Sequence, residues 1–242
     1  MREKERIAKV MARAGLCSRR EAERWIADGR VAVNGKILDS PAFTVGEGDE
    51  ITVDGKKLGA PEKTRLFLYH KPAGIVTTNS DEKGRTTVFD RLPAELPRVV
   101  TVGRLDINTE GLLLLTNDGG LARHLELPAN GWRRRYRVRV HGTVRDSDLK
   151  KLADGVTVDG VKYGKIEAER EREQTSANVW LTMTLTEGKN REVRKVLEHL
   201  GLKVNRLIRV SYGPFHLGGL PEASAKEVSQ KVLKEQIPGF FK

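Results

Sequence analysis

One carboxylate in a glycine-flanked loop stands out as a candidate for chemistry in this 242-residue sequence. Asp106 follows Arg104 and lies between two apolar segments, 99–102 and 112–116, that are typical of strands. Loops carried on a rigid scaffold are where catalytic groups concentrate. A carboxylate beside a cation stays ionised and, once desolvated, can act as a nucleophile. The residue types alone favour a plainer role, in which Asp106 pairs with Arg104 or forms an Asx turn.

Other chemistries lack the residues that they need. The five histidines are scattered without metal-ligand spacing, and the single cysteine, Cys17, can form neither an intrachain disulfide nor a thiolate cluster. Asp106 and Glu110 are the only neighbouring carboxylates near the loop, too few for a two-metal site. No phosphate-binding glycine motif is present. The sequence therefore predicts an enzyme without metal or cofactor, or no enzyme at all.

The charge balance points to a polyanionic partner. The sequence has 44 Lys and Arg against 33 Asp and Glu, a net charge of +11, which favours nucleic acid. No apolar run approaches the roughly 20 residues that cross a bilayer. The charged first residues predict no signal peptide, and a single cysteine is typical of a reducing compartment, so we expect a cytoplasmic protein without membrane contact.

Residues 1–60 read as a small module that precedes the candidate loop. One apolar stripe over 7–14 predicts a short helix, and Ser18 with Glu21 has the form of a capping box that opens a second. Asn34-Gly35 between short apolar runs predicts a tight hairpin. The module should therefore be two helices followed by a small sheet. It holds 12 basic and 10 acidic residues, so most of the net charge lies beyond it.

Residues 61–242 must build the scaffold that carries Asp106. Strand-like segments occupy 66–69, 99–102, 112–116, 136–140 and 179–185. Helices are expected over 146–152, from a cap at Asn190 to Gly201, and from a cap at Ser224 to Glu235. Successive strands with scattered helices predict an α+β domain with a mixed, mainly antiparallel sheet and flanking helices.

The first module resembles a known RNA-binding family. The segments 6–22 and 29–36 are similar to an S4 domain, which implies binding of structured RNA through the second helix and the loop beside it. The arginines that would hold RNA phosphates are Arg13, Arg19, Arg20 and Arg24. Taken as residue types only, the same four could form an ordinary solvated surface.

The second module resembles the pseudouridine synthases of the RsuA type. The catalytic motif of that family is matched by Gly103-Arg104-Leu105-Asp106, then by 109–112 and 115–119. Further matching stretches occur in the family's order at 70–74, 90–93, 135–138, 187–195 and 204–209. Together with the S4-like module, the resemblance covers almost the whole chain.

The resemblance implies a role for each matched residue. Asp106 would be the nucleophile that lets uracil detach from its ribose, rotate and rejoin through carbon. Tyr136 would stack on the base, and Arg194 would pair with Asp106 and hold it ionised. Without the family, Tyr136 reads as a core residue and Arg194 as an i,i+4 partner of Glu198.

The remaining implied contacts are with the substrate RNA. Leu207 or Ile208 would form an apolar wall under the uracil, and Lys71 belongs to the family's opening motif. Arg104 could open the RNA stack or bind a phosphate, since a base inside structured RNA must leave its stack to be reached. The arginines expected to grip the backbone around the site are Arg133, Arg134 and Arg137, with Arg135 and Arg139 on the same run.

We therefore expect a cofactor-free rRNA pseudouridine synthase acting on a flipped-out uridine. The sequence of residues 190–194 is more similar to the large-subunit branch of the family than to the small-subunit branch. This similarity favours 23S rRNA, or a pre-ribosomal particle, as the partner. We expect a monomer, because no exposed apolar stripe is evident. Two alternatives remain open: a non-catalytic RNA-binding or ribosome-assembly protein, and a metal-dependent nuclease.

Overall fold

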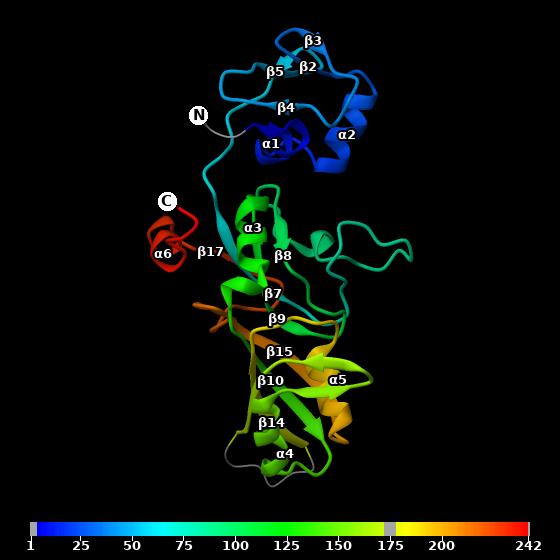
Figure 1. Ribbon diagram of the computed structural model, residues 1–242, viewed down its shortest axis with the longest axis vertical. Helices are drawn as coiled ribbons and strands as arrows, with labels where there is room; N and C mark the ends of the chain where they lie inside the picture. Colours follow the sequence, from blue (N-terminus) through cyan, green and yellow to red (C-terminus); the bar gives the residue numbers. More distant parts are fainter. Residues whose placement is uncertain (1–3, 172–177, 242) are drawn as a thin grey trace. The chain divides into compact units, whose positions relative to one another are not determined.

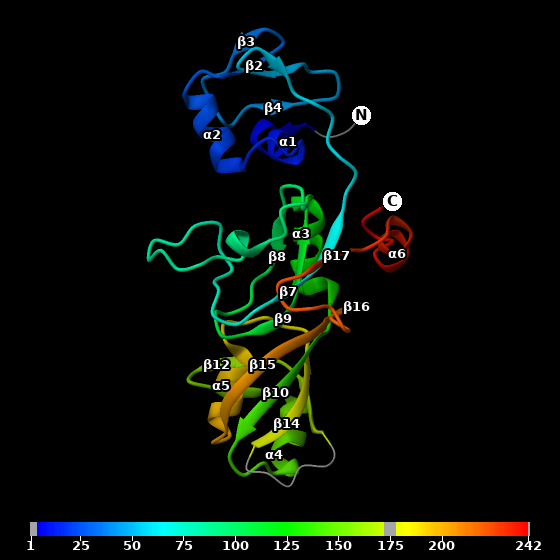
Figure 2. The ribbon, with the colours of Figure 1, turned by 180° about the vertical axis from the view of Figure 1, so that it is seen from behind.

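The computed structural model describes residues 4–171 and 178–241, which form two compact units (Figure 1, Figure 2). The first unit comprises Met1–Thr64 together with Asn117–Gly119. The second comprises Arg65–Thr116 and Gly120–Lys242. Across residues 4–171 and 178–241, no helix has the length and apolar character needed to cross a membrane.

The first unit consists of two helices and short strands. Its elements are β1 (Glu5–Arg6), α1 (Ile7–Arg13), α2 (Arg19–Ala27), β2 (Val31–Val33), β3 (Lys36–Ile37), β4 (Thr44–Val45), β5 (Ile51–Val53) and β6 (Lys56–Lys57). Strands β3, β2, β5 and β6 lie side by side in that order, and β1 pairs with β4. Ile7 and Met11 of α1 and Ile26 of α2 are fully buried in one core with Val31 of β2.

Local sequence rules account for the boundaries of these elements. The Ser18 hydroxyl accepts a hydrogen bond from the Glu21 amide at 3.1 Å, and the Glu21 carboxylate accepts one from the Ser18 amide at 3.2 Å. This is the predicted capping box, and it opens α2. Asn34 and Gly35 take φ values of 50° and 78°, which the tight turn between β2 and β3 requires. Both predictions are confirmed.

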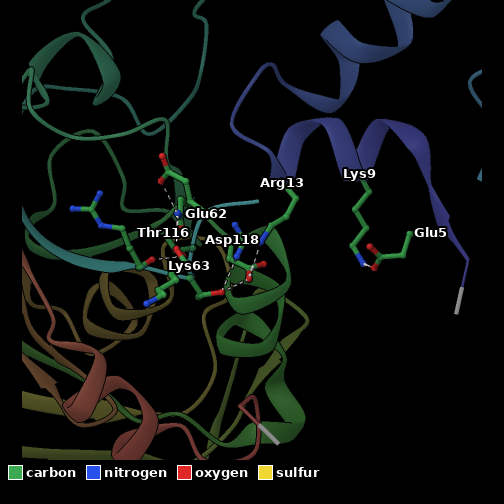
Figure 3. Close-up of polar contacts among 10 residues, drawn as sticks. Glu5, Lys9, Arg13, Glu62, Lys63, Thr116 and Asp118 are labelled. Carbon is green, nitrogen blue, oxygen red and sulfur yellow. Dashed lines mark hydrogen bonds and ion pairs between the residues drawn. The ribbon is translucent and has the colours of Figure 1, made fainter. Parts of the chain in front are cut away.

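A polar cluster ties the end of the first unit to its first helix (Figure 3). Arg13 forms an ion pair with Asp118 at 3.2 Å and donates a hydrogen bond to the Thr64 hydroxyl at 3.0 Å. The Thr64 hydroxyl in turn donates to Asp118 at 2.7 Å. Of the four arginines expected to hold RNA, Arg13 is thus engaged within its own unit.

The second unit is built on a large sheet with helices packed against it. Its strands are β7 (Leu66–Lys71), β8 (Val100–Val102), β9 (Glu110–Thr116), β10 (Arg134–His141), β11 (Val156–Val158), β12 (Val161–Tyr163), β13 (Ile166–Arg170), β14 (Asn178–Leu185), β15 (Lys203–Tyr212), β16 (Phe215–His216) and β17 (Ala225–Glu227). Its α-helices are α3 (Gly119–Glu126), which begins in the first unit's segment, α4 (Asp146–Lys151), α5 (Glu192–His199) and α6 (Gln230–Gln236).

The main sheet is mixed and mostly antiparallel, as predicted. The strand order is β13-β14-β10-β15-β9-β7-β17, with β8 on β9 and β16 on β15. Strands β9 and β15 pair in parallel through Gly111 and Arg209, whereas the neighbouring ladders, β10 with β15 and β7 with β9, are antiparallel. The parallel pair lies directly after the Asp106 loop and joins the two halves of the sheet.

The Leu112–Leu115 run is buried on both faces of the sheet. Leu113 and Leu115 belong to one core, which also holds Val193 of α5. Leu112 and Leu114 belong to a second core on the other face, which α3 and α6 cover. A strand buried on both faces needs a continuous apolar run rather than an alternating one, which accounts for the four leucines.

Two expected helix caps need correction, and one helix is additional to those expected. The cap predicted at Asn190 is wrong, because Arg191 takes the N-cap position and the Glu192 carboxylate accepts a hydrogen bond from the Lys189 amide at 2.9 Å. The cap predicted at Ser224 is also wrong, because residues 225–227 form strand β17 at the edge of the sheet, and Ser229 caps α6 instead. Helix α3 was not predicted, since Asp118-Gly119-Gly120 reads as a turn.

Candidate active site

A cavity of about 580 Å³ in the second unit contains the candidate nucleophile. The loop before β9, the strands β10 and β15, and the beginning of α5 enclose it. Its walls include Arg104, Asp106, Thr109, Arg134, Tyr136, Arg191, Glu192, Leu207 and Arg209. A smaller cavity of about 470 Å³ shares Arg104, Asp106 and Arg191 with the first. Asp106 therefore lies where the two cavities adjoin.

Hydrogen bonds to the backbone hold the Asp106 loop in one shape. Every carbonyl oxygen from Leu105 to Thr109 accepts at least one. The donors are Thr77 Oγ1 to Leu105 at 2.8 Å, the Thr109 amide to Asp106 at 3.0 Å, the Gly74 amide to Ile107 at 2.7 Å, Arg194 Nη2 to Asn108 at 2.8 Å, and Lys71 Nζ to Thr109 at 2.9 Å. A loop fixed in this way holds its side chains in place before a substrate arrives.

The Asp106 carboxylate is itself not committed to a structural contact. Within residues 4–171 and 178–241 it forms no side-chain hydrogen bond and no ion pair, neither with Arg104 nor with the nearby Arg194. The structural alternatives that the residue types favoured, a pair with Arg104 or an Asx turn, are therefore not formed. The carboxylate is available to a ligand in the cavity.

Lys71 forms hydrogen bonds with the backbone of the Asp106 loop and is not among the residues that line the cavity. Its side chain is fully buried, and Nζ donates to the carbonyl oxygens of Pro72 at 2.9 Å, Ile107 at 3.3 Å and Thr109 at 2.9 Å. Burial lowers the pKa of Lys71 to about 8, against the attraction of the acidic Asp106 nearby. The structure places Lys71 beneath the site and shows it in contact with the loop backbone.

We expect Lys71→Met to destabilise the protein by about 2 kcal/mol at pH 7, because buried carbonyls lose a charged donor. The folded-state pKa of about 8 lies below the usual lysine value of about 10.4, so between these values the unfolded chain binds more protons. Stability of the wild type relative to the variant should therefore rise with pH across this window, by about 3 kcal/mol. Urea unfolding at a series of pH values measures this. A difference that stays constant or shrinks above pH 8 would contradict it.

Arg194 contacts the catalytic loop through its backbone. It is buried, donates from Nη2 to Asn108, and has an Nε atom that is buried without a partner in the described chain. Burial and repulsion from Arg191 lower the pKa of Arg194, whereas the attraction of Asp106 opposes this shift. The predicted contact with Asp106 is thus an electrostatic interaction here, and the direct bond is made to Asn108, two residues further along the loop.

Arg194→Met should lower kcat by about 100-fold while KM changes little, because the positive charge and the Asn108 anchor act on Asp106 rather than on substrate binding. Single-turnover and steady-state kinetics separate the two constants. Lys195→Met on the same helix serves as the matched control and should keep the wild-type rate. Arg194→Lys should recover part of kcat. A change confined to KM would contradict this positioning role.

Tyr136 and Leu207 face the cavity from neighbouring strands. Tyr136 is 8% exposed and Leu207 is 3% exposed, and both line the cavity wall. Ile208, the other candidate for the apolar wall, points to the opposite side of β15, where its side chain lies against Gly111. Of the two aliphatic candidates, the structure places Leu207 in the cavity.

The arginines expected to bind the RNA backbone lie on both faces of β10 and just before it. Burial alternates along this strand, so Arg134 is buried on the side of Tyr136 while Arg135 and Arg137 are exposed on the other. Arg137 is paired with Glu171 at 2.7 Å, and Arg133 is paired with Glu167. Only Arg134 of the three predicted arginines lines the cavity.

The sequence pattern did not single out three polar residues of the cavity wall. Thr109, Glu192 and Arg209 are at most 4% exposed, and each has one buried polar atom without a hydrogen-bond partner in the described chain: Oγ1, Oε1 and Nη2. Burial raises the pKa of Glu192. For Arg209 a signal existed, since a charged residue interrupts the apolar run Leu207 to Val210. Polar atoms that have no protein partner at a cavity wall are available to a ligand or water in that cavity.

The described residues offer no cluster of metal ligands. Across the residues that the structure describes, no group of three or more His, Cys, Asp or Glu side chains is placed so that it could hold a metal ion. The carboxylates on the cavity wall have other neighbours: Glu126 accepts a hydrogen bond from the Gly103 amide at 2.7 Å, and Glu187 pairs with Lys189 at 2.5 Å.

Comparison with known proteins finds family matches for both parts of the chain. Residues 65–199 match the RNA pseudouridylate synthase family, and residues 5–51 match the S4 domain. An RNA pseudouridine synthase from Rickettsia felis is 44% identical over 96% of this chain and 100% of its own length. The ribosomal large subunit pseudouridine synthase B of Yersinia pestis is 43% identical over 94% of this chain and 73% of its own length.

A solved structure shows the same fold over nearly the whole chain. The crystal structure of a pseudouridylate synthase superimposes with a TM-score of 0.67 at 26% identity, and the match covers 96% of this chain and 99% of the other. The family and S4 matches, the full-length relatives and the shared fold all agree. The chain therefore belongs to the RNA pseudouridylate synthase family, and it is an isomerase with an S4 domain at its N-terminal end.

Proposed function

We propose that this enzyme converts a uridine of large-subunit ribosomal RNA to pseudouridine, with Asp106 as the nucleophile. The observation that carries the proposal is the uncommitted Asp106 carboxylate, held at a cavity that Tyr136 and Leu207 also line. The names of the relatives from Yersinia pestis and Haemophilus influenzae, both ribosomal large subunit pseudouridine synthase B, support the choice of RNA.

The reaction exchanges one bond to the ribose for another. The bond between N1 of uracil and C1′ breaks, and a bond between C5 and C1′ forms. The hydrogen on C5 leaves to water, and N1 takes up a proton, so no atom is gained and no electron is transferred. A nucleophilic carboxylate divides such a step into two easier ones.

The shape of the site requires the target base to leave its stack. Tyr136 and Leu207 are nearly buried, so a uracil can lie between Asp106 and these side chains only when its nucleotide is turned out of the RNA helix. Extrusion of a base costs a few kcal/mol, and least in a loop or bulge. Arg104 lies on the wall of both cavities, which supports a role in holding the opened strand.

Tritium release tests the choice of substrate. Transcripts of 23S and 16S rRNA that carry tritium on C5 of uridine are incubated with the enzyme, and released tritium is counted. We expect release from the 23S transcript and none from the 16S transcript. Release from 16S rRNA alone would overturn the large-subunit assignment. Release from neither, with the RNA bound, would favour the non-catalytic alternative.

We propose further that the first unit binds RNA through α2. Arg19, Arg20 and Arg24 are exposed there and form no ion pair within the described chain, unlike Arg13. Arg20→Glu combined with Arg24→Glu should weaken RNA binding by at least about tenfold. The slope of log affinity against log salt concentration should fall by the amount expected for the loss of about two phosphate contacts. Filter binding at several salt concentrations measures both. Lys57→Glu, which changes the charge of a residue paired with Glu50, is the control. Unchanged affinity of the double variant would contradict this role.

A further inference from the structure

Two buried arginines lie close to one tyrosine on the wall of the cavity. The Arg134 and Arg209 guanidinium carbons lie 4.7 Å and 5.2 Å from the centre of the Tyr212 ring. Arg134 is 9% exposed and Arg209 is 2% exposed, and all three residues line the cavity. Neither guanidinium has a carboxylate oxygen within 4 Å in the described part of the chain. Buried charges are ordinarily paired, so two without a counter-charge need an explanation.

Both terminal nitrogens of Arg134 are in use as donors. Its Nη2 donates to the Tyr212 hydroxyl at 2.8 Å, and its Nη1 donates to the carbonyl oxygens of Trp132, Thr186 and Glu187. These contacts fix both the guanidinium and the tyrosine ring. Arg134 therefore supplies a fixed positive charge rather than free donors.

Arg209 differs, because part of its donor set is unused. Its Nε donates to the Leu112 carbonyl oxygen at 2.8 Å, while Nη2 is buried and has no hydrogen-bond partner among residues 4–171 and 178–241. A buried donor left unpaired costs the free energy of its desolvation, unless a ligand restores the bond. An unused donor on a buried charge, beside a second buried charge, favours an anion over a neutral carbonyl group as that ligand.

The acidic residues of the cavity do not supply the missing charge. Glu187 is paired with Lys189, and Glu126 is bound to the Gly103 amide. Glu192 contacts the Lys189 amide, and its burial raises its pKa, which weakens it as a counter-charge for Arg134. The two arginines therefore form the cationic end of the cavity.

The strand register places this end next to the expected target base. Tyr136 of β10 is paired directly with Arg209 of β15, and both side chains are on the buried face. Side chains opposite one another on neighbouring strands have Cβ atoms about 5 Å apart. An anion that reaches Arg209 while a base stacks on Tyr136 must be attached to that nucleotide or its neighbour.

We propose that Arg209, beside the fixed charge of Arg134, binds a phosphodiester group of the RNA adjoining the target uridine. The inference rests on the proposed function, since it takes Tyr136 as the partner of the target base. It assigns to Arg209 a direct substrate contact and to Arg134 the fixed charge that supports it. The arginine fork suits two oxygens of one phosphate.

The wild-type enzyme tests the proposal with chemically altered RNA. In a synthetic stem-loop that carries the mapped target uridine, each phosphodiester near it is replaced in turn by a neutral methylphosphonate, with 2′-O-methyl ribose at that linkage and in its phosphate control. We expect one linkage adjoining the target to lower RNA affinity about tenfold. If no linkage adjoining the target matters, the proposal fails, whatever any variant does.

Arg209→Gln then assigns the contact. The variant should bind the unaltered stem-loop about tenfold more weakly than the wild type, and the sensitive methylphosphonate should cause no further loss. Arg209→Lys keeps the charge but not the fork and should lie between them. Arg145→Gln, at an exposed arginine outside the site, is the matched control. If Arg209→Gln and the wild type are equally sensitive at every linkage, the assignment is wrong.

Failure of the phosphate site and failure of the proposed isomerase function give different results in these experiments. A wild type that releases tritium from the unaltered stem-loop but is insensitive to neutral linkages refutes the phosphate site and leaves the isomerase activity standing. A wild type that binds the stem-loop and releases no tritium from any rRNA refutes the proposed function, and the inference falls with it.

Discussion

Asp106→Asn should lower the single-turnover rate of isomerisation by at least about 1,000-fold, equivalent to about 4 kcal/mol of barrier. Asparagine has almost the same shape as aspartate, so the loop that Lys71, Gly74 and Arg194 hold by its carbonyl oxygens should persist. What disappears is the carboxylate, which the structure leaves without a partner at the cavity. An amide is a poor nucleophile, and no neighbouring group takes its place.

Rate and binding must be measured on the same preparations. We expect Asp106→Asn to bind RNA within about twofold of the wild type, because phosphate contacts dominate RNA affinity. Asp154→Asn makes the same chemical change at an exposed position and should leave the rate unchanged. A variant that keeps more than a tenth of the wild-type rate would show that Asp106 is not the nucleophile.

Gly111→Ala should be the most destabilising small substitution in the second unit, costing about 4 kcal/mol or more. Gly111 has a φ of +102°, and a Cβ atom there would lie 2.3 Å from the Arg209 carbonyl oxygen and 2.8 Å from its amide nitrogen. Both obstacles are backbone atoms of the parallel β9–β15 pair, so they cannot move aside as a flexible side chain could. Either β15 separates from β9, or the loop before β9 shifts with Asp106.

Gly160→Ala separates the two causes of that cost. Gly160 also has a positive φ, +76°, but nothing lies within 4 Å of its added Cβ. The control should lose only the roughly 1–2 kcal/mol of the backbone conformation. The midpoint of urea unfolding measures both variants. Equal losses for the two would contradict the close approach of the strands at Gly111.

Local patterns predicted much of the fold because local forces decide those features. The Ser18 capping box and the Asn34-Gly35 turn each depend on a few neighbouring residues, and both are confirmed. The strand at 178–185 and the helix at 146–151 also follow from periodicity. The start of α6 does not, because residues 225–227 become an edge strand only when β7 is beside them.

The candidate site was likewise predictable only in part from the sequence. A glycine-flanked Asp106 and the family motifs indicated which residues to consider, but not their partners. That Lys71 is wholly buried beneath the loop, that Leu207 rather than Ile208 lines the cavity, and that Arg134 and Arg137 take opposite faces of β10 all depend on the sheet. Buried atoms without partners, such as Arg209 Nη2, are visible only once the surroundings are complete.

Charge is distributed in keeping with two tasks. The first unit has exposed arginines on α2, while the second has two buried arginines, Arg134 and Arg209, on the wall of its cavity. Exposed charges provide affinity that salt weakens, whereas buried ones are screened much less. On this account the first unit binds RNA broadly, and the second orients one nucleotide against Asp106.

The most direct test of the central claim is nucleoside analysis of a 23S rRNA transcript after incubation with the wild-type enzyme in excess EDTA. We predict that one uridine per transcript becomes pseudouridine, with the RNA chain intact, and that Asp106→Asn produces none. Bound but unmodified RNA would contradict the claim in favour of a binding protein. RNA that is cut only when EDTA is left out would contradict it in favour of a metal-dependent nuclease.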